Sequence, residues 1–473
     1  MRMRFWKTLL ATVALAVVSV ASAAPQVWEK SIAPGLSYRM EYDPAIPRTV
    51  HGLRFNPKAS VKAVPELGER TIFSPGQWKG RQTVSALVKG TGALAGINGD
   101  FFPWNGAPMG MMVRSGELLT APMASRSVFA WGPDFAGLGR VQAKFVAERF
   151  GWENREFGLN EETGPDALVL HTEAAGFTYA AKGTPSHAVL RIVGGRFAPG
   201  EFVEVEMSHF APTEPYVAVP HNHVVLTGTG FHRPYVAGLV TGERITFRLQ
   251  ASGLPWDKIE QLIAGGPNLV VNSRVSVDAG SQGFSSAFAG QRHPRTAVGR
   301  TPEGDLWFVA VDGRQSVSAG ATLTELAQIM VRLGCADAIN LDGGGSTTFN
   351  VLGSTLNRPS GGSERPVANA VLFYGPPDEP LSGPIALTAP KSLTDGQAVK
   401  LSVKNAEGVV VPNTDVLWSA FGSAWVDQGG TLRTLGAGTA WVAATVRGQK
   451  VVQEISVTAP SRKATRTVKK KKR

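Results

Sequence analysis

Cysteine is almost missing from this chain, since Cys335 is the only one among 473 residues. A single cysteine excludes a disulfide bond within the chain, so an exported protein of this sequence relies on core burial, bound ions or both. Cys335 stands between an apolar helical segment and an apolar strand. We therefore expect it to be a small buried hydrophobic residue and not a nucleophile.

Charged residues are also few, at 18% of the chain, yet the formal net charge is +11. Three of the positive charges are Arg2, Arg4 and Lys7, and eight more lie in residues 460–473, where no acid offsets them. The body between these segments is formally neutral, so the net charge gives no reason to expect specific nucleic-acid binding. We expect residues 460–473 to be a disordered basic tail, which either contacts anionic cell-surface polymer or lipid headgroups or only aids solubility.

Long apolar runs are missing as well, with one exception at Leu9–Val20. This run is too short to span a membrane, follows a basic region and precedes the small residues Ala21-Ser22-Ala23, a pattern typical of a cleaved signal peptide. No cysteine follows the run, which excludes a bacterial lipid anchor. The sequence predicts a signal peptide at 1–23 and a secreted, periplasmic or cell-surface protein.

Glycine (54) and proline (31) are abundant and fall between short apolar runs, which favours many strands and turns over a helical bundle. Apolar runs of this kind are Ala188–Val193, Val217–Val219, Ile245–Leu249 and Leu306–Val311. One helix is predicted at about Leu323–Leu333, where Thr322 and Glu325 have the spacing of a capping box. A short buried strand, Ala338–Leu341, follows. The expected fold class is α+β, with a β-rich catalytic domain and few helices.

Composition divides the chain into two folded parts. Residues 24–374 contain no low-complexity break, residues 375–384 are rich in Pro and Gly like a linker, and residues 385–459 have short strand-like runs at regular intervals. The last segment predicts a small all-β sandwich. Its Val416-Leu417-Trp418-Ser419 and Gly436-Ala437-Gly438-Thr439 motifs resemble bacterial immunoglobulin-like domains of group 2, which implies an adhesive or spacer module without chemistry of its own.

The strongest candidate site is the turn Asn340–Thr347, which reads NLDGGGST. Three glycines at a strand end let a ligand approach the main chain, and their amides can form a seat for an anion. Polar side chains flank the glycines on both sides. The candidate residues here are Asn340, Asp342, Gly343, Gly344, Gly345, Ser346 and Thr347.

Three further clusters have the same character. Asn98 and Asp100 stand among apolar residues in INGDFF, where burial is costly unless the groups are paired or bind a ligand. Arg295 lies in RHPRTAVG, and Asp312 and Arg314 follow the apolar strand Leu306–Val311. Arginine suits phosphate because its planar donors engage two oxygens at once. Each cluster alone could be a hairpin turn or a surface ion pair.

Taken in order, the motifs INGDFF, AGGPNLV, HPRTAVG, VDGRQ and AINLDGGGSTT, closed by Arg365-Pro366-Val367-Ala368-Asn369-Ala370, resemble the phosphodiester glycosidase family. The eukaryotic member of that family uncovers mannose 6-phosphate by removing a blocking N-acetylglucosamine, and bacterial members are often labelled as exopolysaccharide proteins. The resemblance covers about Gly96–Tyr374 and is densest from Arg292 to Thr348. It implies a hydrolase for sugar-1-phosphodiesters or related cell-envelope glycans, with a carbohydrate or sugar-phosphate polymer as substrate.

This chemistry suggests roles for the candidates. A phosphate monoester is a good leaving group, so the enzyme needs cations on the phosphate and a carboxylate near the anomeric carbon. We expect Arg295, Arg314 and the glycine amides to hold the phosphate, Asp312 and Asp342 to be catalytic, and Asn98 and Asp100 to hold sugar hydroxyls or a divalent ion.

No cofactor is required by the sequence, although Asp100, Asp312 and Asp342 could gather a hard cation such as Ca²⁺. Two other functions stay open: a carbohydrate-binding or adhesion protein without turnover, and a metal-dependent phosphodiesterase that cuts the P–O bond.

Overall fold

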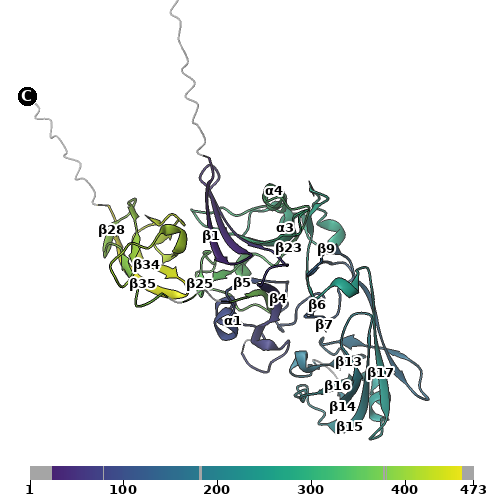
Figure 1. The fold of residues 1–473 in the computed structure, drawn as a ribbon. Helices are drawn as coiled ribbons and strands as arrows, with labels where there is room; N and C mark the ends of the chain where they lie inside the picture. The colour runs from purple at the N-terminus through teal and green to yellow at the C-terminus, as the bar shows by residue number, and fades with distance from the viewer. Residues whose placement is uncertain (1–23, 78, 181–183, 377–378, 380, 461–473) are drawn as a thin grey trace, which may run out of the picture.

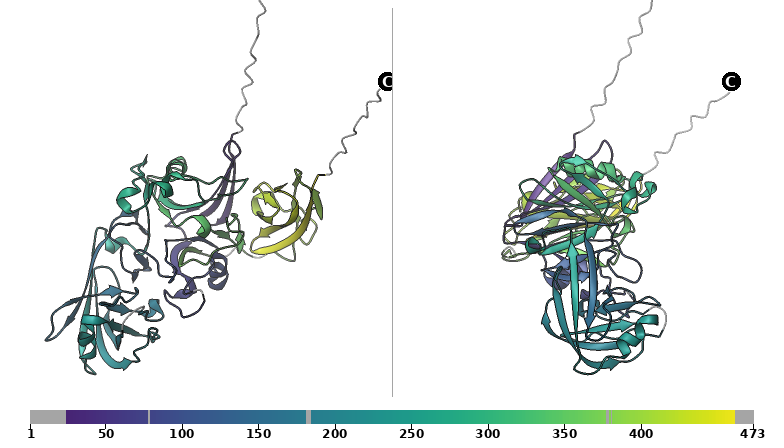
Figure 2. Two further views of the ribbon diagram at one scale, coloured as in Figure 1. Left: turned by 180° about the vertical axis from the view of Figure 1, so that it is seen from behind. Right: turned by 90° about the vertical axis from the view of Figure 1, so that its right-hand side faces the viewer.

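The computed structural model describes residues 24–77, 79–180, 184–376, 379 and 381–460. The predicted signal peptide and residues 461–473 of the predicted tail lie outside this part of the chain. The described residues form a central body with one lobe on each side, one made by the middle of the sequence and one by its end (Figures 1 and 2). The protein is β-rich with few helices, as expected from its glycine and proline content.

The central body is built around an antiparallel sheet of eight strands, the main sheet. Its strands, in spatial order, are β1 (Gln26–Ala33), β2 (Leu36–Asp43), β3 (Arg48–Phe55), β22 (Leu306–Val311), β21 (Arg295–Arg300), β23 (Asp337–Leu341), β19 (Asn268–Val271) and β20 (Arg274–Val275). The strands β22 and β23 both pair antiparallel with β21. They therefore run in the same direction, and their carboxyl ends meet at one edge of the sheet.

A second sheet packs on one face of the main sheet. Its strands, in order, are β25 (Ser354–Thr355), β24 (Phe349–Val351), β5 (Ala95–Asn98), β26 (Asn369–Tyr374) and β4 (Lys62–Leu67). The apolar sides of the two sheets share one core, in which Phe373 packs against Phe55 and Phe308 with ring centroids 5.9 and 5.1 Å apart. Removal of this large apolar area from water is the main force that holds the two sheets together.

The helix α4 (Leu323–Arg332) covers the other face of the main sheet, where its buried side is Leu323, Leu326, Ala327, Ile329 and Met330. The predicted capping box is confirmed: the Glu325 amide donates to the Thr322 hydroxyl at 3.1 Å, and the Thr322 amide donates to the Glu325 carboxylate at 2.9 Å. Cys335 is 1% exposed in the same core, as expected. The three other α-helices among the described residues are short: α1 (Val84–Thr91), α2 (Arg233–Ala237) and α3 (Ser286–Gly290).

A bridging sheet connects the central body to the lobe made by the middle of the sequence. Its strands are β7 (Glu117–Thr120), β6 (Met112–Arg114), β18 (Gln261–Gly265), β8 (Ser127–Gly132) and β9 (Phe135–Gly139). Along β8, Phe129 and Trp131 join the central core, while Val128 and Ala130 join the core of the lobe. This alternation follows from the two-residue period of a strand and explains why β8 is apolar on both sides.

The middle lobe has its own sheet of eight strands, the outer sheet, with α2 packed on it. The strands are β11 (Arg155–Glu156), β10 (Gln142–Arg149), β17 (Arg244–Ser252), β15 (Phe202–Ala211), β14 (Ser186–Gly195), β16 (His223–Gly228), β13 (Leu168–His171) and β12 (Gly158–Leu159). Two of the apolar runs in this region lie in β14 and β17 as strands. The third, Val217–Val219, lies in the loop between β15 and β16, where it forms one isolated bridge, between Phe177 and Ala218.

The C-terminal lobe consists of short strands, as the strand-like runs of residues 385–459 indicated. They form a four-stranded sheet of β28 (Ser392–Thr394), β35 (Gln449–Thr458), β34 (Gly438–Val446) and β31 (Leu417–Gly422), a three-stranded sheet of β29 (Ala398–Lys400), β33 (Thr431–Thr434) and β32 (Ala424–Val426), and a pair of β27 (Ala386–Thr388) and β30 (Ser402–Lys404). Their inner residues share one core. None of the described helices has the length and apolar character needed to cross a membrane.

The C-terminal lobe is held against the central body by hydrogen bonds to its backbone carbonyl groups. Lys30 of β1 donates to the carbonyl oxygens of Asn413, at 2.8 Å, and Val416. Arg358, in the chain after β25, donates to the carbonyl oxygens of Ala424 and Gly422. These contacts hold the lobe against the body.

Candidate active site

The glycine-rich turn follows β23 directly, with the short 3₁₀ turn η6 (Gly344–Ser346) inside it. A Cβ atom on Gly343 would lie 2.7 Å from the Pro294 carbonyl oxygen, and Gly344 has a φ of +61°. Both positions therefore require glycine for the path of the chain alone. Glycine also leaves the surface of the turn bare, which matters for the groups that lie against it.

Two of the three glycine amides are used within the protein. The Gly343 amide donates to the Asp342 carboxylate at 2.9 Å, and the Gly344 amide donates to the Pro294 carbonyl oxygen at 2.9 Å. For the Gly345 amide, the described residues supply no acceptor. Of the three amides that were expected to form an anion-binding site, only that of Gly345 is therefore available to a ligand.

Asp342 is the first residue of the turn; the residue is partly exposed, but protein encloses most of its carboxyl group. Burial raises the pKa of this carboxyl group to about 6, although hydrogen bonds from Ser346 and Gly343 and the positive charges of Arg365 and Arg126 oppose the shift. A carboxylate with this pKa is ionised at neutral pH but is basic enough to accept a proton in a reaction.

Asp100 is a second carboxyl group beside the first. It is 4% exposed and accepts hydrogen bonds from the amides of Phe101, at 2.7 Å, and Gly110, at 2.9 Å. Burial raises its pKa to about 7, and the negative charge of Asp342 adds to the rise. The two carboxyl groups are therefore coupled, and the pair titrates near neutrality.

Arg126 lies close to both carboxyl groups. Its guanidinium group stacks over the rings of Phe101 and Phe284, at 4.8 and 4.1 Å from the ring centroids. Burial lowers the pKa of Arg126, while the charges of Asp100 and Asp342 oppose that change. No sequence motif pointed to this residue, since it stands alone in the loop between β7 and β8.

Two exposed arginines lie directly on the bare turn. A Cβ atom on Gly344 would be 3.4 Å from Arg314 Nη2, and one on Gly345 would be 2.3 Å from Arg365 Nη2. Arg365 also donates to the Ser346 hydroxyl at 3.4 Å. Arg314 was predicted as a phosphate contact; Arg365 stood in the closing RPVANA motif without an assigned role. Together they bring two cations to the turn that carries Asp342.

His293 joins this group through Arg314, whose guanidinium nitrogens lie 3.3 and 3.4 Å from the His293 Nδ1 atom. Burial lowers the pKa of His293, and the positive charges of Arg314 and Arg295 lower it further. The imidazole is therefore neutral at neutral pH, and it was missed because a single histidine before a proline has no distinctive spacing.

Arg295 was expected to contact phosphate, but its side chain is 1% exposed and turned into the protein. Its guanidinium donates to the carbonyl oxygens of Ala321, at 3.0 Å, Phe288 and Gln291. Burial lowers its pKa to about 10, with a further contribution from Arg314. In this structure Arg295 fixes the segment that contains α3 and does not present its donors to a ligand.

Three other candidate residues have buried side chains that lie beneath the turn. Asn98 is fully buried at the end of β5 and donates to the Asp342 carbonyl oxygen at 2.7 Å, while its own oxygen accepts from Thr296 and Thr348. Asn340 donates to the Gly266 carbonyl oxygen at 2.8 Å. Thr347 is 1% exposed. These side chains set the position of the turn; contact with a substrate would require them to be exposed.

Asp312 lies apart from the carboxyl pair. It is 2% exposed, and its carboxylate accepts from the Arg358 amide, at 3.0 and 3.1 Å, and from the Asn357 side chain, at 3.3 Å. His51 Nε2 lies 3.6 Å from the same carboxylate. Asp312 thus anchors the chain after β25 inside the body. The structure brings Asp100, and not Asp312, next to Asp342.

No group of three or more His, Cys, Asp or Glu side chains that could hold a metal ion occurs in the described part of the chain. The arrangement in which Asp100, Asp312 and Asp342 gather one Ca²⁺ is therefore not found. The chemistry available at the turn is that of two coupled carboxyl groups and several arginines.

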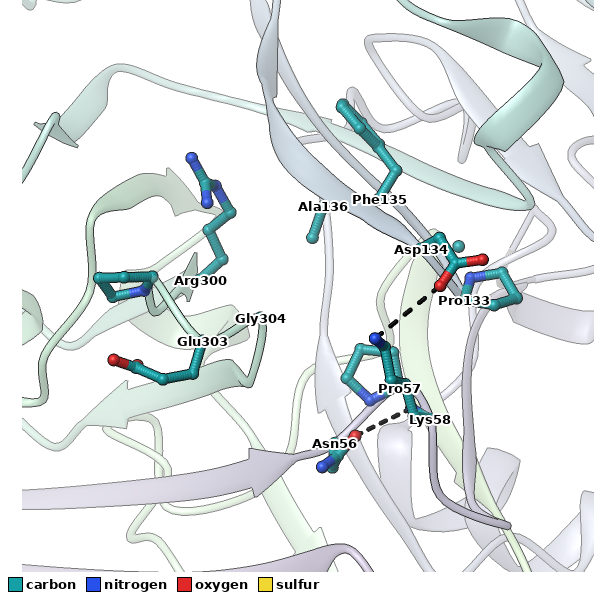
Figure 3. Close-up of a pocket in the computed structure, with 12 residues that line it drawn as sticks. Asn56, Pro57, Lys58, Pro133, Asp134, Phe135, Ala136, Arg300, Glu303 and Gly304 are labelled. Carbon is teal, nitrogen blue, oxygen red and sulfur yellow. Dashed lines mark hydrogen bonds and ion pairs between the residues drawn. The ribbon is translucent and has the colours of Figure 1, made fainter.

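A well-formed hollow of about 430 Å³ lies elsewhere on the body (Figure 3). Arg300, Glu303 and the loops that contain Lys58 and Asp134 line it. Arg300 pairs with Leu306 at one end of β21, whereas Arg295 pairs with Val311 at the other end. The hollow is therefore at the opposite edge of the main sheet from Asp342, and it is not part of the candidate site.

Comparison with known proteins finds a family model that matches part of the chain. Residues 187–374 match the model of the phosphodiester glycosidase family. Mouse and human N-acetylglucosamine-1-phosphodiester alpha-N-acetylglucosaminidase are 36% and 34% identical over 112 and 111 residues, which is 23% of this chain and 20% of each relative. The SPbeta prophage-derived protein YomE of Bacillus subtilis is 38% identical over 88 residues, 19% of this chain and 14% of YomE. The chain thus matches a fifth or less of the length of these relatives.

Solved structures share the fold over a larger part of the chain. A hypothetical protein from Synechocystis superposes with a TM-score of 0.58 at 21% identity, covering 72% of this chain and 63% of the other. A protein from Burkholderia pseudomallei superposes with a TM-score of 0.56 at 23% identity, covering 69% and 74%. The segment 187–374, which contains Arg314, Asp342 and Arg365, thus matches the phosphodiester glycosidase family, while sequence likeness to its named members is confined to part of the chain.

Proposed function

We propose that this protein is an exported glycosidase that hydrolyses the glycosidic bond of sugar-1-phosphodiesters or related cell-envelope glycans. One observation carries the proposal: the coupled carboxyl groups of Asp342 and Asp100 adjoin a bare glycine turn on which Arg314 and Arg365 lie. This combination suits a substrate that has an anomeric carbon and a phosphate next to each other.

In the proposed reaction the arginines receive the phosphate. Arg314 and Arg365 engage its oxygens, with the Gly345 amide as a third donor, and this stabilises the charge that develops as the phosphate leaves. Because the leaving group is already good, the reaction does not depend on a strong general acid.

Asp342, the more exposed member of the carboxyl pair, acts on the sugar side. Asp342, which is ionised above pH 6, stabilises the positive charge at the anomeric carbon as nucleophile or activates water as base. Asp100, which keeps its proton up to about pH 7, stands beside it in the acid form. Two carboxyl groups with different environments at one site are typical of glycoside hydrolysis.

The family match supports the reaction type, and the printed activity of the mammalian relatives supports a phosphodiester-linked sugar as the substrate. Export, an immunoglobulin-like identity of residues 385–459, and contact of the basic tail with anionic polymer or lipid are parts of the proposal. They rest on the sequence patterns at 1–23, 385–459 and 460–473.

The test is hydrolysis of a sugar-1-phosphodiester with a methyl group on the phosphate, carried out in ¹⁸O-water. The label is expected in the released sugar, because the C–O bond breaks. Label in the phosphate would instead indicate P–O cleavage by a phosphodiesterase. Absence of turnover across a panel of such diesters, with the folded protein, would leave a binding protein as the better description.

A further inference from the structure

The hollow shown in Figure 3 continues into a second one along the strand β9. The first has a volume of about 430 Å³ and the second about 410 Å³, and each is within the range of ligand pockets, roughly 300–1,000 Å³. Phe135, Ala136 and Arg300 line both hollows. The two therefore lie side by side and form one depression, the β9 groove. Among the described strands β9 pairs with β8 alone, at the edge of the bridging sheet.

The β9 groove is separate from the candidate active site. Arg300 and Asp337, which face each other on β21 and β23, line it and form an ion pair at 2.6 Å. Asp337 begins β23, and Asp342 follows the end of that strand. The five steps of extended chain between these two residues span roughly 16 Å. A ligand that lies against Arg300 and Asp337 therefore leaves the carboxyl pair free.

Three polar atoms at the second hollow have no hydrogen-bond partner among the described residues. They are the Ser127 hydroxyl oxygen, the Asn268 Oδ1 atom and the Arg300 Nε atom, and all three are buried. Ser127 as a whole is 1% exposed. Buried polar atoms without partners cost free energy, so a ligand that supplies the partners is favoured. The hydroxyl can donate or accept, Nε donates and Oδ1 accepts, which requires a ligand that does both.

The charged side chains around the β9 groove balance one another. Three are basic and three are acidic: Lys58, Arg140, Arg300, Asp134, Glu303 and Asp337. Lys58 and Asp134 also lie 3.9 Å apart across one end of the first hollow (Figure 3). A phosphate or a polyanion gains little from a lining without net charge. The β9 groove therefore favours a neutral ligand.

We infer that the β9 groove is a second binding site, which takes a neutral oligosaccharide. Sugar hydroxyl groups both donate and accept hydrogen bonds, as the unpartnered atoms of Ser127, Asn268 and Arg300 require. The half-buried ring of Phe135 supplies an apolar surface for the C–H groups of a sugar. Such a site would keep the protein on a glycan polymer while the candidate active site stays free, and it does not depend on hydrolysis at Asp342.

The test is calorimetric titration of neutral hexasaccharides into the full-length protein. The probes are an α-1,4-glucan, a β-1,3-glucan and a β-1,4-linked N-acetylglucosamine oligomer, and at least one should bind with a Kd on the order of 10⁻⁴ M. Gly137→Phe should weaken this binding about tenfold, because its ring fills the groove. The variant should fold, since a Cβ atom on Gly137 has no neighbour closer than Phe135 Cζ, at 3.5 Å, and Gly137 lies outside the left-handed region.

Gly90→Phe is the matched control, because it makes the same substitution in α1. A Cβ atom on Gly90 meets nothing within 4 Å, and its backbone is also outside the left-handed region. Binding should stay within about twofold of the wild type, the range for a surface change away from the site. Ser127→Ala should lower the affinity about fivefold, the loss of one hydrogen bond, with an unchanged melting temperature, because its hydroxyl has no partner in the protein.

Asp342→Asn keeps this inference distinguishable from the proposed function, and it should bind the hexasaccharide as tightly as the wild type does. Loss of binding in Asp342→Asn with full binding in Gly137→Phe would place the oligosaccharide in the candidate active site and overturn the second site. Equal binding in Gly137→Phe and Gly90→Phe, or no binding of the three probes to the wild type, would also overturn it. None of these results depends on whether a phosphodiester is hydrolysed.

Discussion

Asp342 and Asp312 occupy equivalent places in the main sheet but have different surroundings. Each directly follows a buried strand and precedes a glycine, and the two strands, β23 and β22, run in the same direction on either side of β21. The Asp312 carboxylate accepts hydrogen bonds from the Arg358 amide and the Asn357 side chain, whereas Asp342 is a partly exposed residue beside charged side chains. The same local motif thus produces an anchor at one strand end and a candidate catalytic group at the next.

Replacement of Asp342 should have the largest effect on activity. Asp342→Asn retains an oxygen that can accept from the Gly343 amide, so the turn should keep its shape, while the reactive carboxylate is lost. We expect kcat to fall by about 10³-fold, within the range for a positioned acid–base group, and the melting temperature to stay near that of the wild type. Undiminished turnover would remove Asp342 from the mechanism.

Replacement of Asp312 should affect stability instead. Asp312→Asn places an amide N–H₂ group against the donors of Arg358 and Asn357, and one of those donors then loses its acceptor. The free energy of unfolding should fall by about 3 kcal/mol, as measured by chemical denaturation. The folded fraction should keep most of its kcat. A stable variant with no activity would reverse the roles assigned to the two residues.

Removal of one positive charge from the glycine turn should reduce activity less than replacement of Asp342 does. Arg365→Ala leaves the glycine turn without one of its two guanidinium groups, and kcat/KM should fall about 10²-fold, the lower end for loss of a charge-stabilising donor. Arg274→Ala is the matched control, because Arg274 is an exposed arginine on the edge strand β20. Equal kinetics in the two variants would argue against phosphate binding at the turn.

The pH dependence of the reaction should reflect the carboxyl pair. Asp342 must lose its proton, at a pKa of about 6, and loss of the Asp100 proton, at a pKa of about 7, adds a second negative charge where a phosphate must bind. We therefore expect kcat/KM to rise and then fall, with a maximum between these values. Asp100→Asn cannot ionise, so its profile should lose the alkaline fall. A fall that persists in this variant would show that another group is responsible for it.

The sequence was sufficient to locate the elements that carry the turn. The helix α4, with its capping box, and the strands β22 and β23 have strong local signals, and the structure contains all three. The helix α1 was missed because its eight residues contain Ser, Gly and Thr as well as apolar residues. The bridging and outer sheets depend on pairings far apart in the sequence, which local patterns do not encode.

The structure places some of the predicted site residues at the turn and others away from it. The glycine turn and Arg314 lie where a ligand could reach them, but Asp312 and Arg295 were chosen because acid and base types in a polar motif look alike before their partners are known. Asp100 was assigned to substrate binding, and its closeness to Asp342 comes from the pairing of β5 within the second sheet. Arg126 comes from a loop without any motif, so only the folded chain brings it to the carboxyl pair.

The anchoring of the C-terminal lobe has a consequence for the order in which the protein folds. Lys30 lies in the first strand of the structure, yet the carbonyl groups that receive its ammonium group belong to Asn413 and Val416. The ribosome makes the chain from its N-terminus. The strand β1 therefore lacks these partners until nearly four hundred later residues have been synthesised. The body can therefore reach its final packing only after the C-terminal lobe has been synthesised, because that lobe supplies the acceptors for Lys30 of β1.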